Sequence, residues 1–149
     1  PELSSAPMRA LWWMLTALPA VWVADSGAYF IGRRFGSHKL SPHLSPKKTW
    51  EGYWAGVITG TLAGAFFAFL WGYFTGPDSQ ITPLRGAMIG LILSTLTTLG
   101  DRGESMIKRQ VGVKDSGKLL PGHGGMFDRI DSWLWGAVLG YYLAIWFIR

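Results

Sequence analysis

The chain alternates between long apolar stretches and short segments rich in charge. Four stretches are apolar enough to predict helices, and they cover Leu11–Phe30, Tyr53–Phe74, Gly86–Leu99 and Trp133–Ile148. A helix needs about 20 residues to cross a bilayer. The second stretch meets this length and the first nearly does, whereas the last two reach it only if their polar ends extend into the interface. A soluble bundle would need polar helix faces that these segments lack. The pattern therefore predicts an all-α, polytopic membrane helical bundle with about four transmembrane helices.

Basic residues are distributed unevenly between the segments that join these helices. Five Lys or Arg lie in Arg33–Glu51 and six in Asp101–Asp131, but only one lies in Thr75–Arg85. Loops that carry excess Lys and Arg stay on the cytoplasmic side of a membrane. We therefore expect two cytoplasmic loops that form the active site, in the compartment that contains nucleotides. The expected location is a membrane, with both charged loops on its cytoplasmic side.

Length and composition narrow the picture further. The 149 residues suit a single membrane-embedded domain, residues 1–149, and we expect it to be the C-terminal part of a longer chain. Cysteine is absent, which excludes disulfides, thiolate metal sites and cysteine nucleophiles within the chain. Gly56, Gly60 and Gly64 recur at four-residue spacing, which predicts a small-residue helix face for close packing.

Carboxylates at the charged ends of the apolar stretches are candidates for a metal site. Asp101 and Asp128 each lie beside an apolar stretch and each precede an Arg. Mg²⁺ takes oxygen ligands and completes its shell with water and substrate phosphate. If the third helix continues past Asp101, this residue, Ser105 and Lys108 share one face. The alternative is that each Asp forms an interfacial salt bridge with the Arg that follows it. Asp131 would then provide a favourable negative charge at the N-terminus of the last helix.

Asp25 is a separate carboxylate, because it lies within the first apolar stretch. An ionisable residue at such a position is a functional candidate. It either joins the metal site, orders Tyr29, Arg33 or a Lys, or pairs with a basic residue to fix helix packing. The sequence leaves these alternatives open.

Both charged loops contain groups that suit phosphate. In the second loop, His123, Gly124 and Gly125 offer backbone N–H groups that a phosphate can approach, since glycine has no Cβ. Cationic donors accompany them at Lys108, Arg109, Lys114 and Arg129, with the hydroxyl of Ser105. In the first loop, two Lys between hydroxyl residues precede a helix, and the candidates there are Ser45, Lys47, Lys48 and Thr49. The alternative for the first loop is an anchor for anionic lipids.

Taken together, these segments resemble the phosphatidate cytidylyltransferases, also called CDP-diacylglycerol synthases. The signature positions are Ser105, Lys108-Arg109, Lys114-Asp115, His123-Gly124-Gly125 and Asp128-Arg129-Ile130-Asp131. The resemblance extends to Ala24–Tyr29, Phe35–Leu40 and Ser45–Gly52. It covers the chain from Val23 onward and identifies it as similar to the C-terminal catalytic half of the family.

The resemblance implies transfer of CMP from CTP to phosphatidic acid, giving CDP-diacylglycerol and pyrophosphate in phospholipid biosynthesis. It implies catalytic, metal-binding carboxylates at Asp101 and Asp128, and we keep Asp25 and Asp131 as further candidate ligands. The expected cofactor is Mg²⁺ or another divalent cation, and a second, monovalent ion is left open. A homodimer in the lipid bilayer is also implied, and no nucleic-acid partner is expected.

Two other functions would use similar basic loops. A membrane-bound lipid or polyprenol kinase would phosphorylate its lipid and release a nucleoside diphosphate. A non-enzymatic transporter of anionic lipids would need an internal repeat or a broken helix at the midplane. The sequence shows no repeat, and Pro19 is the one residue that suggests a break.

Overall fold

The computed structural model describes residues 6–41, 45–76, 81–110 and 127–148. Most of these residues form four helices: α1 (Ala6–Phe35), α2 (Trp50–Thr75), α3 (Pro83–Gln110) and α4 (Phe127–Ile148). Each helix contains one predicted apolar stretch and extends into the polar residues beside it, so the helical fold is confirmed. The third helix continues past Asp101, which was the condition for a shared face with Ser105 and Lys108. The first helix is continuous through Pro19.

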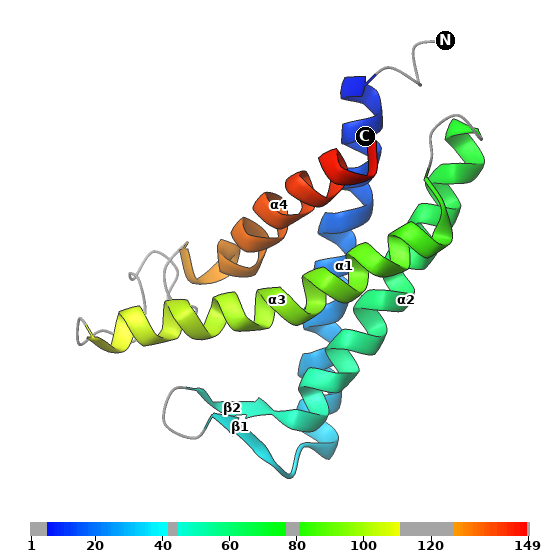
Figure 1. Cartoon of the computed structure of the whole chain (residues 1–149). Coiled ribbons are helices and arrows are strands. Elements are labelled where there is room, and N and C mark those ends of the chain that lie inside the picture. Colours follow the sequence, from blue (N-terminus) through cyan, green and yellow to red (C-terminus); the bar gives the residue numbers. More distant parts are fainter. Residues whose placement is uncertain (1–5, 42–44, 77–80, 111–126, 149) are drawn as a thin grey trace.

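A small hairpin between α1 and α2 departs from the all-α prediction. Strands β1 (Lys39–Ser41) and β2 (Ser45–Thr49) pair antiparallel, with Lys39 opposite Thr49 and Ser41 opposite Ser45. These short strands contain mostly polar residues, so the alternation of apolar and polar positions that predicts a strand is missing. Figure 1 shows the hairpin at the lower end of the molecule, where α1 ends and α2 begins.

The glycines of α2 allow close approach of α1 on one side and α3 on the other. A Cβ built at Gly56 would lie 3.1 Å from the Cβ of Ala28, and one at Gly60 would lie 2.8 Å from the Cβ of Ala24. The same atom at Gly60 would lie 2.9 Å from the Cβ of Ser94 on α3, and Gly64 lies against the backbone of Gly90. The predicted small-residue face at Gly56, Gly60 and Gly64 is therefore confirmed.

The apolar core lies at the opposite end of the bundle from the hairpin. It is built by residues of all four helices and the segment before α3, namely Trp13, Ala17, Val21, Ala68, Ile81, Ile89, Leu93 and Ala144. Trp71 packs on the ring of Trp12 with 5.2 Å between ring centroids and donates its indole N–H to the carbonyl of Leu15. These contacts fix α1 against α2 at this end, and the hairpin lies at the other end (Figure 1).

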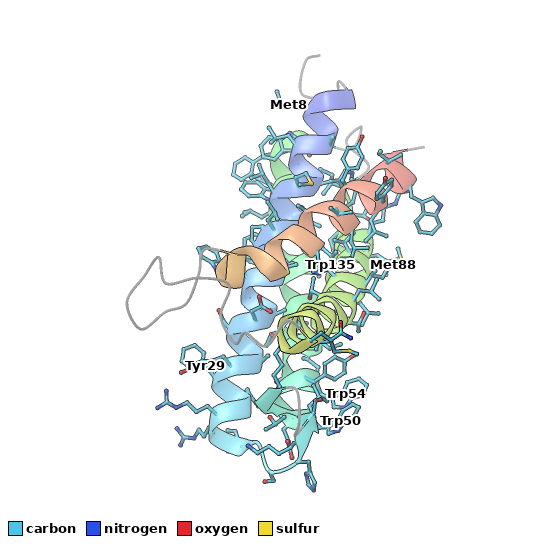
Figure 2. All side chains as sticks on the ribbon, turned by 90° about the vertical axis from the view of Figure 1, so that its left-hand side faces the viewer. Met8, Tyr29, Trp50, Trp54, Met88 and Trp135 are labelled. Atoms are coloured by element: carbon cyan, nitrogen blue, oxygen red, sulfur yellow. The ribbon has the colours of Figure 1, made fainter. Side chains whose placement is uncertain are left out.

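Two helices of the described part are long and apolar enough to cross a membrane, over Ala10–Phe35 and Trp50–Thr75. Within the most apolar 18 residues of each stretch, only 28% and 22% are buried, whereas the core helix of a soluble protein is mostly buried. Exposed aromatic residues flank the second stretch: Figure 2 shows Trp50 and Trp54 near the hairpin, and Tyr73 lies at the far end of α2. Aromatic residues are typical of both interfaces of a bilayer. In α4 the apolar stretch is shorter, Trp135–Trp146.

Candidate active site

Basic residues gather where α1 ends and the hairpin begins. Arg33 and Arg34 lie in the last turn of α1 and are exposed. The strands then carry Lys39 on β1 and Lys47 and Lys48 on β2. The cations of the first charged loop therefore lie at one end of the bundle. The side chains of Lys47 and of Ser45, also a candidate for substrate binding, lie outside the described residues.

Three contacts join His38 to the first turn of α2. The backbone N–H of Trp50 donates to the carbonyl of His38 over 3.0 Å. The backbone N–H of His38 donates to both carboxylate oxygens of Glu51, over 3.2 and 3.3 Å. The ring Nδ1 of His38 lies 2.7 Å from Oε1 of Glu51. These contacts close the hairpin at its base and so fix where the strand with Lys47 and Lys48 meets α2.

Sequence reasoning did not single out His38 or Glu51 as functional residues. Both fall in segments that carry the family resemblance, but they are thirteen positions apart in the chain. A Glu in the first helical turn is also expected from the helix dipole alone. Their pairing depends on the hairpin, which the sequence pattern did not predict.

Thr49, a candidate for phosphate binding, caps the N-terminus of α2. Its hydroxyl oxygen accepts the backbone N–H of Gly52 over 3.2 Å, and its side chain is only 4% exposed. A Cβ added to Gly32 of α1 would lie 3.0 Å from this oxygen. The hydroxyl of Thr49 thus satisfies a free N–H of the helix end at a point where α1 packs against the start of α2. Lys48, beside it, is half-buried.

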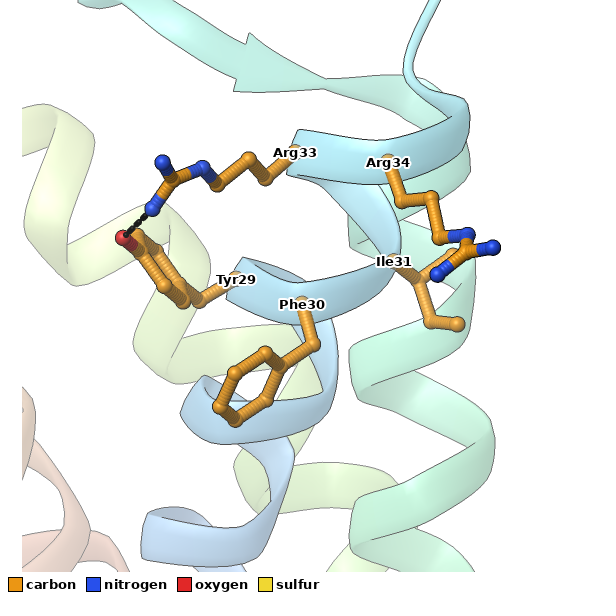
Figure 3. Close-up of a pocket in the computed structure, with 5 residues that line it drawn as sticks. All are labelled: Tyr29, Phe30, Ile31, Arg33 and Arg34. Carbon is orange, nitrogen blue, oxygen red and sulfur yellow. Dashed lines mark hydrogen bonds between the residues drawn. The ribbon is translucent and has the colours of Figure 1, made fainter.

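The end of α1 also forms an amphipathic depression of about 560 Å³, lined by Tyr29, Phe30, Ile31, Arg33 and Arg34. Figure 3 shows the guanidinium of Arg33 turned toward Tyr29, whose hydroxyl it contacts over 2.9 Å, and that of Arg34 turned away. Apolar side chains therefore lie between two cations at the end of a helix of membrane length. This arrangement suits the boundary between hydrocarbon and anionic headgroups.

Helices α3 and α4 meet at Gly100 and Trp135. A Cβ added to Gly100 would lie 2.5 Å from Cδ1 of the Trp135 indole and 2.7 Å from its Cγ and Nε1. Asp101 follows Gly100 directly on α3. On α4, positions 131 and 128 lie one and two turns before Trp135, and helical periodicity puts them on the same side of the helix. The structure describes the backbone at Asp101, Asp128 and Asp131, but their side chains lie outside the described residues.

Helix α4 meets α1 one residue further on. A Cβ at Gly136 would lie 3.2 Å from Cγ2 of Val21, and one at Gly140 would lie 3.0 Å from the Cβ of Ala17. The two helices are therefore antiparallel, and successive contacts lie one turn apart. Asp25 lies one turn beyond Val21, on the same side of α1. Its side chain is exposed.

These two contacts bring the carboxylate-bearing parts of three helices to one side of the bundle. Asp25 lies just beyond the contact of α1 with α4, and Asp101 just beyond the contact of α3 with α4. Asp131 and Asp128 lie on the turns of α4 that precede both contacts. In Figure 1 the end of α3 and the start of α4 lie on the same side of the molecule. The backbone therefore allows the three helices to contribute acidic side chains to a common site.

The donors at these positions fit a divalent metal ion, because Mg²⁺ binds carboxylate oxygens and keeps water or phosphate in its remaining positions. Among the side chains that the structure describes, no three His, Asp or Glu come together. The side chains of Asp101, Asp128 and Asp131 are not among those described. Asp25 is the member of the set whose side chain is described.

Several other predicted site residues fall partly or wholly outside the described part. Ser105, Lys108 and Arg109 lie on the last turns of α3, and Arg129 lies on the first turn of α4, each with its backbone alone described. The remaining candidates, Lys114, His123, Gly124 and Gly125, lie between α3 and α4, outside the described residues. Their assignment stays a prediction.

Comparison with known proteins decides the family. The family model described as the cytidylyltransferase family matches residues 2–147. The chain belongs to the cytidylyltransferase family. The resemblance found in the sequence is thereby confirmed, and it extends over nearly the whole chain.

Three curated bacterial relatives are similar to the chain. The chain is 47% identical over 130 residues to the phosphatidate cytidylyltransferase of Haemophilus influenzae, covering 85% of the chain and 43% of the relative. It is 45% identical over 131 residues to that of Synechocystis sp., covering 88% and 42%. It is 40% identical over 136 residues to that of Mycobacterium bovis, covering 91% and 42%. The chain thus spans less than half the length of these relatives.

Proposed function

We propose that the chain is the C-terminal catalytic part of a membrane-embedded phosphatidate cytidylyltransferase. It transfers a cytidylyl group from CTP to phosphatidic acid and yields CDP-diacylglycerol and pyrophosphate. The observation that carries this proposal is the match of the cytidylyltransferase family to residues 2–147, together with relatives of that activity at 40–47% identity. The meeting of α1, α3 and α4 beside four acidic residues supports it.

The chemistry requires positioning more than a protein nucleophile. A phosphate oxygen of phosphatidic acid attacks the α-phosphorus of CTP, and the bond from that phosphorus to the bridging oxygen of pyrophosphate breaks. Both reactants are polyanions that repel each other, so catalysis consists largely of charge neutralisation and in-line orientation. The nucleophile is already anionic near neutral pH and needs no Ser or Cys.

Asp101 and Asp128 would hold the divalent ion, with Asp131 and Asp25 as further ligands. Bound there, Mg²⁺ or another divalent cation would neutralise phosphate charge in the transition state. A second, monovalent ion at the same carboxylates remains an open part of the proposal. Cationic side chains would bind the phosphates of CTP and of the lipid: Lys47, Lys48, Lys108, Arg109, Lys114 and Arg129. The backbone at His123, Gly124 and Gly125 would add N–H donors, and Ser45 and Ser105 would add hydroxyls. Thr49 is left out of this set, because its buried hydroxyl caps α2.

The hairpin and the α3–α4 segment would face the cytoplasm, the source of CTP. The chain would cross the membrane four times if α3 and α4 also span it, with their polar ends in the interface. Two membrane-length helices and the excess of basic residues in both loops support this arrangement. The lipid substrate would then reach the site from the bilayer, with its headgroup at the level of Arg33 and Arg34. The proposal includes a bacterial inner membrane and a homodimer.

One experiment separates this function from the kinase and the transporter. The full-length protein in detergent is given phosphatidic acid, Mg²⁺ and CTP labelled at either its α- or its γ-phosphorus. A cytidylyltransferase moves the α-label into a lipid and releases the γ-label as pyrophosphate. A kinase supplied in parallel with diacylglycerol or a polyprenol, and with γ-labelled CTP or ATP, would place the γ-label in that lipid instead. No labelled lipid in any of these reactions would contradict both enzymes. The continuity of α1 through Pro19 already removes the helix break that favoured a transporter.

A further inference from the structure

Trp135 occupies an unusual position between α3 and α4. Its indole lies so close to Gly100 that a Cβ there would come within 2.7 Å of three ring atoms. Real Cβ atoms do not approach carbon or nitrogen this closely, so position 100 has to be Gly for the ring to lie where it does. The rest of the indole is open, since the residue is 45% exposed. One part of the ring therefore rests on the backbone of α3.

The adjacent face of α4, which begins with the next residue, is packed in a different way. Gly136 and Gly140 bring the backbone of α4 onto Val21 and Ala17 of α1, with added Cβ atoms at 3.2 and 3.0 Å. Small residues therefore set the distance of α4 from α1. The indole of Trp135 sets its distance from α3, because it is the side chain found against Gly100. One large side chain thus controls one of the two spacings of α4.

That spacing bears directly on the proposed metal site. Asp101 is the residue after Gly100, while positions 131 and 128 lie roughly 6 and 10 Å along α4 from Trp135 at a rise of about 1.5 Å per residue. Any change in the separation of the helices at Gly100 and Trp135 shifts Asp101 relative to the acidic residues of α4. A metal ion tolerates only a few tenths of an ångström in its ligand distances.

We propose that Trp135 is a positioning residue of the active site. Its indole holds α3 and α4 at the separation that lets Asp101 and the carboxylates of α4 bind one divalent ion. This inference rests on the proposed function, and it concerns a residue outside the motifs that carry the family resemblance. It makes Gly100 and Trp135 a matched pair, in which the small residue makes room for the large one.

The matched pair is tested by adding a methyl group on one helix and removing the ring from the other. In the full-length protein, Gly100→Ala forces the indole away, and Trp135→Leu leaves a gap without a clash. Each single variant should weaken Mn²⁺ binding, measured by electron paramagnetic resonance, by roughly tenfold or more, and raise the half-saturating Mg²⁺ concentration for cytidylyl transfer equally. The double variant should recover most of both losses, because the methyl group then occupies space that the ring has vacated.

Trp146→Leu is the control, since it removes an indole from the same helix three turns away. It should leave Mn²⁺ binding unchanged. Wild-type Mn²⁺ affinity in folded Trp135→Leu protein would overturn the inference, even if Gly100→Ala fails to fold. Equal losses in both single variants without recovery in the double variant would also overturn it. A wild-type protein that binds no Mn²⁺ and transfers no cytidylyl group would instead overturn the proposed function.

Discussion

The carboxylate of Glu51 binds His38 twice, through its backbone N–H and through Nδ1 of its ring. Because Glu51 lies in the first turn of α2 and His38 just before β1, this pair ties the hairpin to the helix that follows it. The hairpin carries Lys47 and Lys48, so its orientation decides where two of the proposed phosphate-binding cations lie. The first prediction concerns this pair.

Replacing Glu51 by Ala should loosen the base of the hairpin and raise the KM for CTP several-fold, with a smaller effect on kcat. The reason is that Lys47 and Lys48 keep their charge but lose their fixed position. His38→Ala should reproduce most of the effect, and the double variant should add little to either change. Steady-state kinetics over a CTP titration measures this. The control is Lys39→Ala on β1, and a KM for Glu51→Ala equal to the wild-type value would contradict the prediction.

The second prediction is that the first and second charged loops share one side of the membrane. The chain has no cysteine, so single cysteines can be placed at Ser37, Gln110 and Thr82, all of which are exposed. In oriented vesicles, with any cysteines outside this segment replaced, Ser37→Cys and Gln110→Cys should react with an impermeant thiol reagent from the cytoplasmic side. Thr82→Cys should react from the opposite side. Labelling of Ser37→Cys and Gln110→Cys from opposite sides would exclude the four-span arrangement.

The third prediction concerns the carboxylates. Asn keeps the shape of Asp and removes its charge, so Asp101→Asn and Asp128→Asn should each reduce turnover by roughly a hundredfold or more in a folded, membrane-inserted protein. The double variant should be scarcely worse than either single one, because groups that act as a unit are not additive. The measurement is cytidylyl transfer across a Mg²⁺ titration. Near-normal activity and unchanged metal dependence in either variant would remove that residue from the site.

The fourth prediction concerns the cations. Replacement of Lys47, Lys48, Lys108 or Arg109 by Ala should lower kcat/KM. The drop should correspond to about 1–3 kcal/mol of lost transition-state stabilisation for each lost charge-assisted contact. Arg85→Ala is the matched control, since Arg85 lies beside the start of α3, at the other end of α2 from the hairpin. Unchanged kinetics at low salt in all four variants would favour the alternative of an anionic-lipid anchor.

The fifth prediction concerns the glycine face of α2. Gly60→Ala places a methyl group within 3 Å of both Ala24 and Ser94, so α1 or α3 has to move. We expect a loss of about 1–3 kcal/mol in stability. The control is Leu62→Ala, two residues further along α2, where the side chain is exposed. This variant should lose much less stability. Thermal unfolding in detergent compares the two, and equal stability of both variants would contradict close packing at Gly60.

Hydropathy predicted the four helices because apolar residues dominate each of them. The same reasoning missed the hairpin, since its strands are mostly polar and are defined by pairing rather than by pattern. It gave Thr49 a phosphate-binding role, whereas the structure shows it as the N-cap of α2, a role for which Thr directly before a helix is typical. The contact of Gly100 with Trp135 joins residues far apart in the chain, and no local signal reveals it. Position beside the apolar stretches and the family resemblance both pointed to Asp101 and Asp128, whereas the contacts that place their backbones on one side of the bundle come from the structure alone.

The contacts of α4 have a consequence for how the protein is made. During synthesis on the ribosome, α1 and α2 can pack through their glycines before α3 exists, and α3 can then join α2. Trp135 and Gly136 of α4, which pack on α3 and α1, are translated after both of those helices. A nascent chain can therefore insert and pack α1, α2 and α3 before the contacts of α4 form. The proposed metal site would be assembled only at this later step.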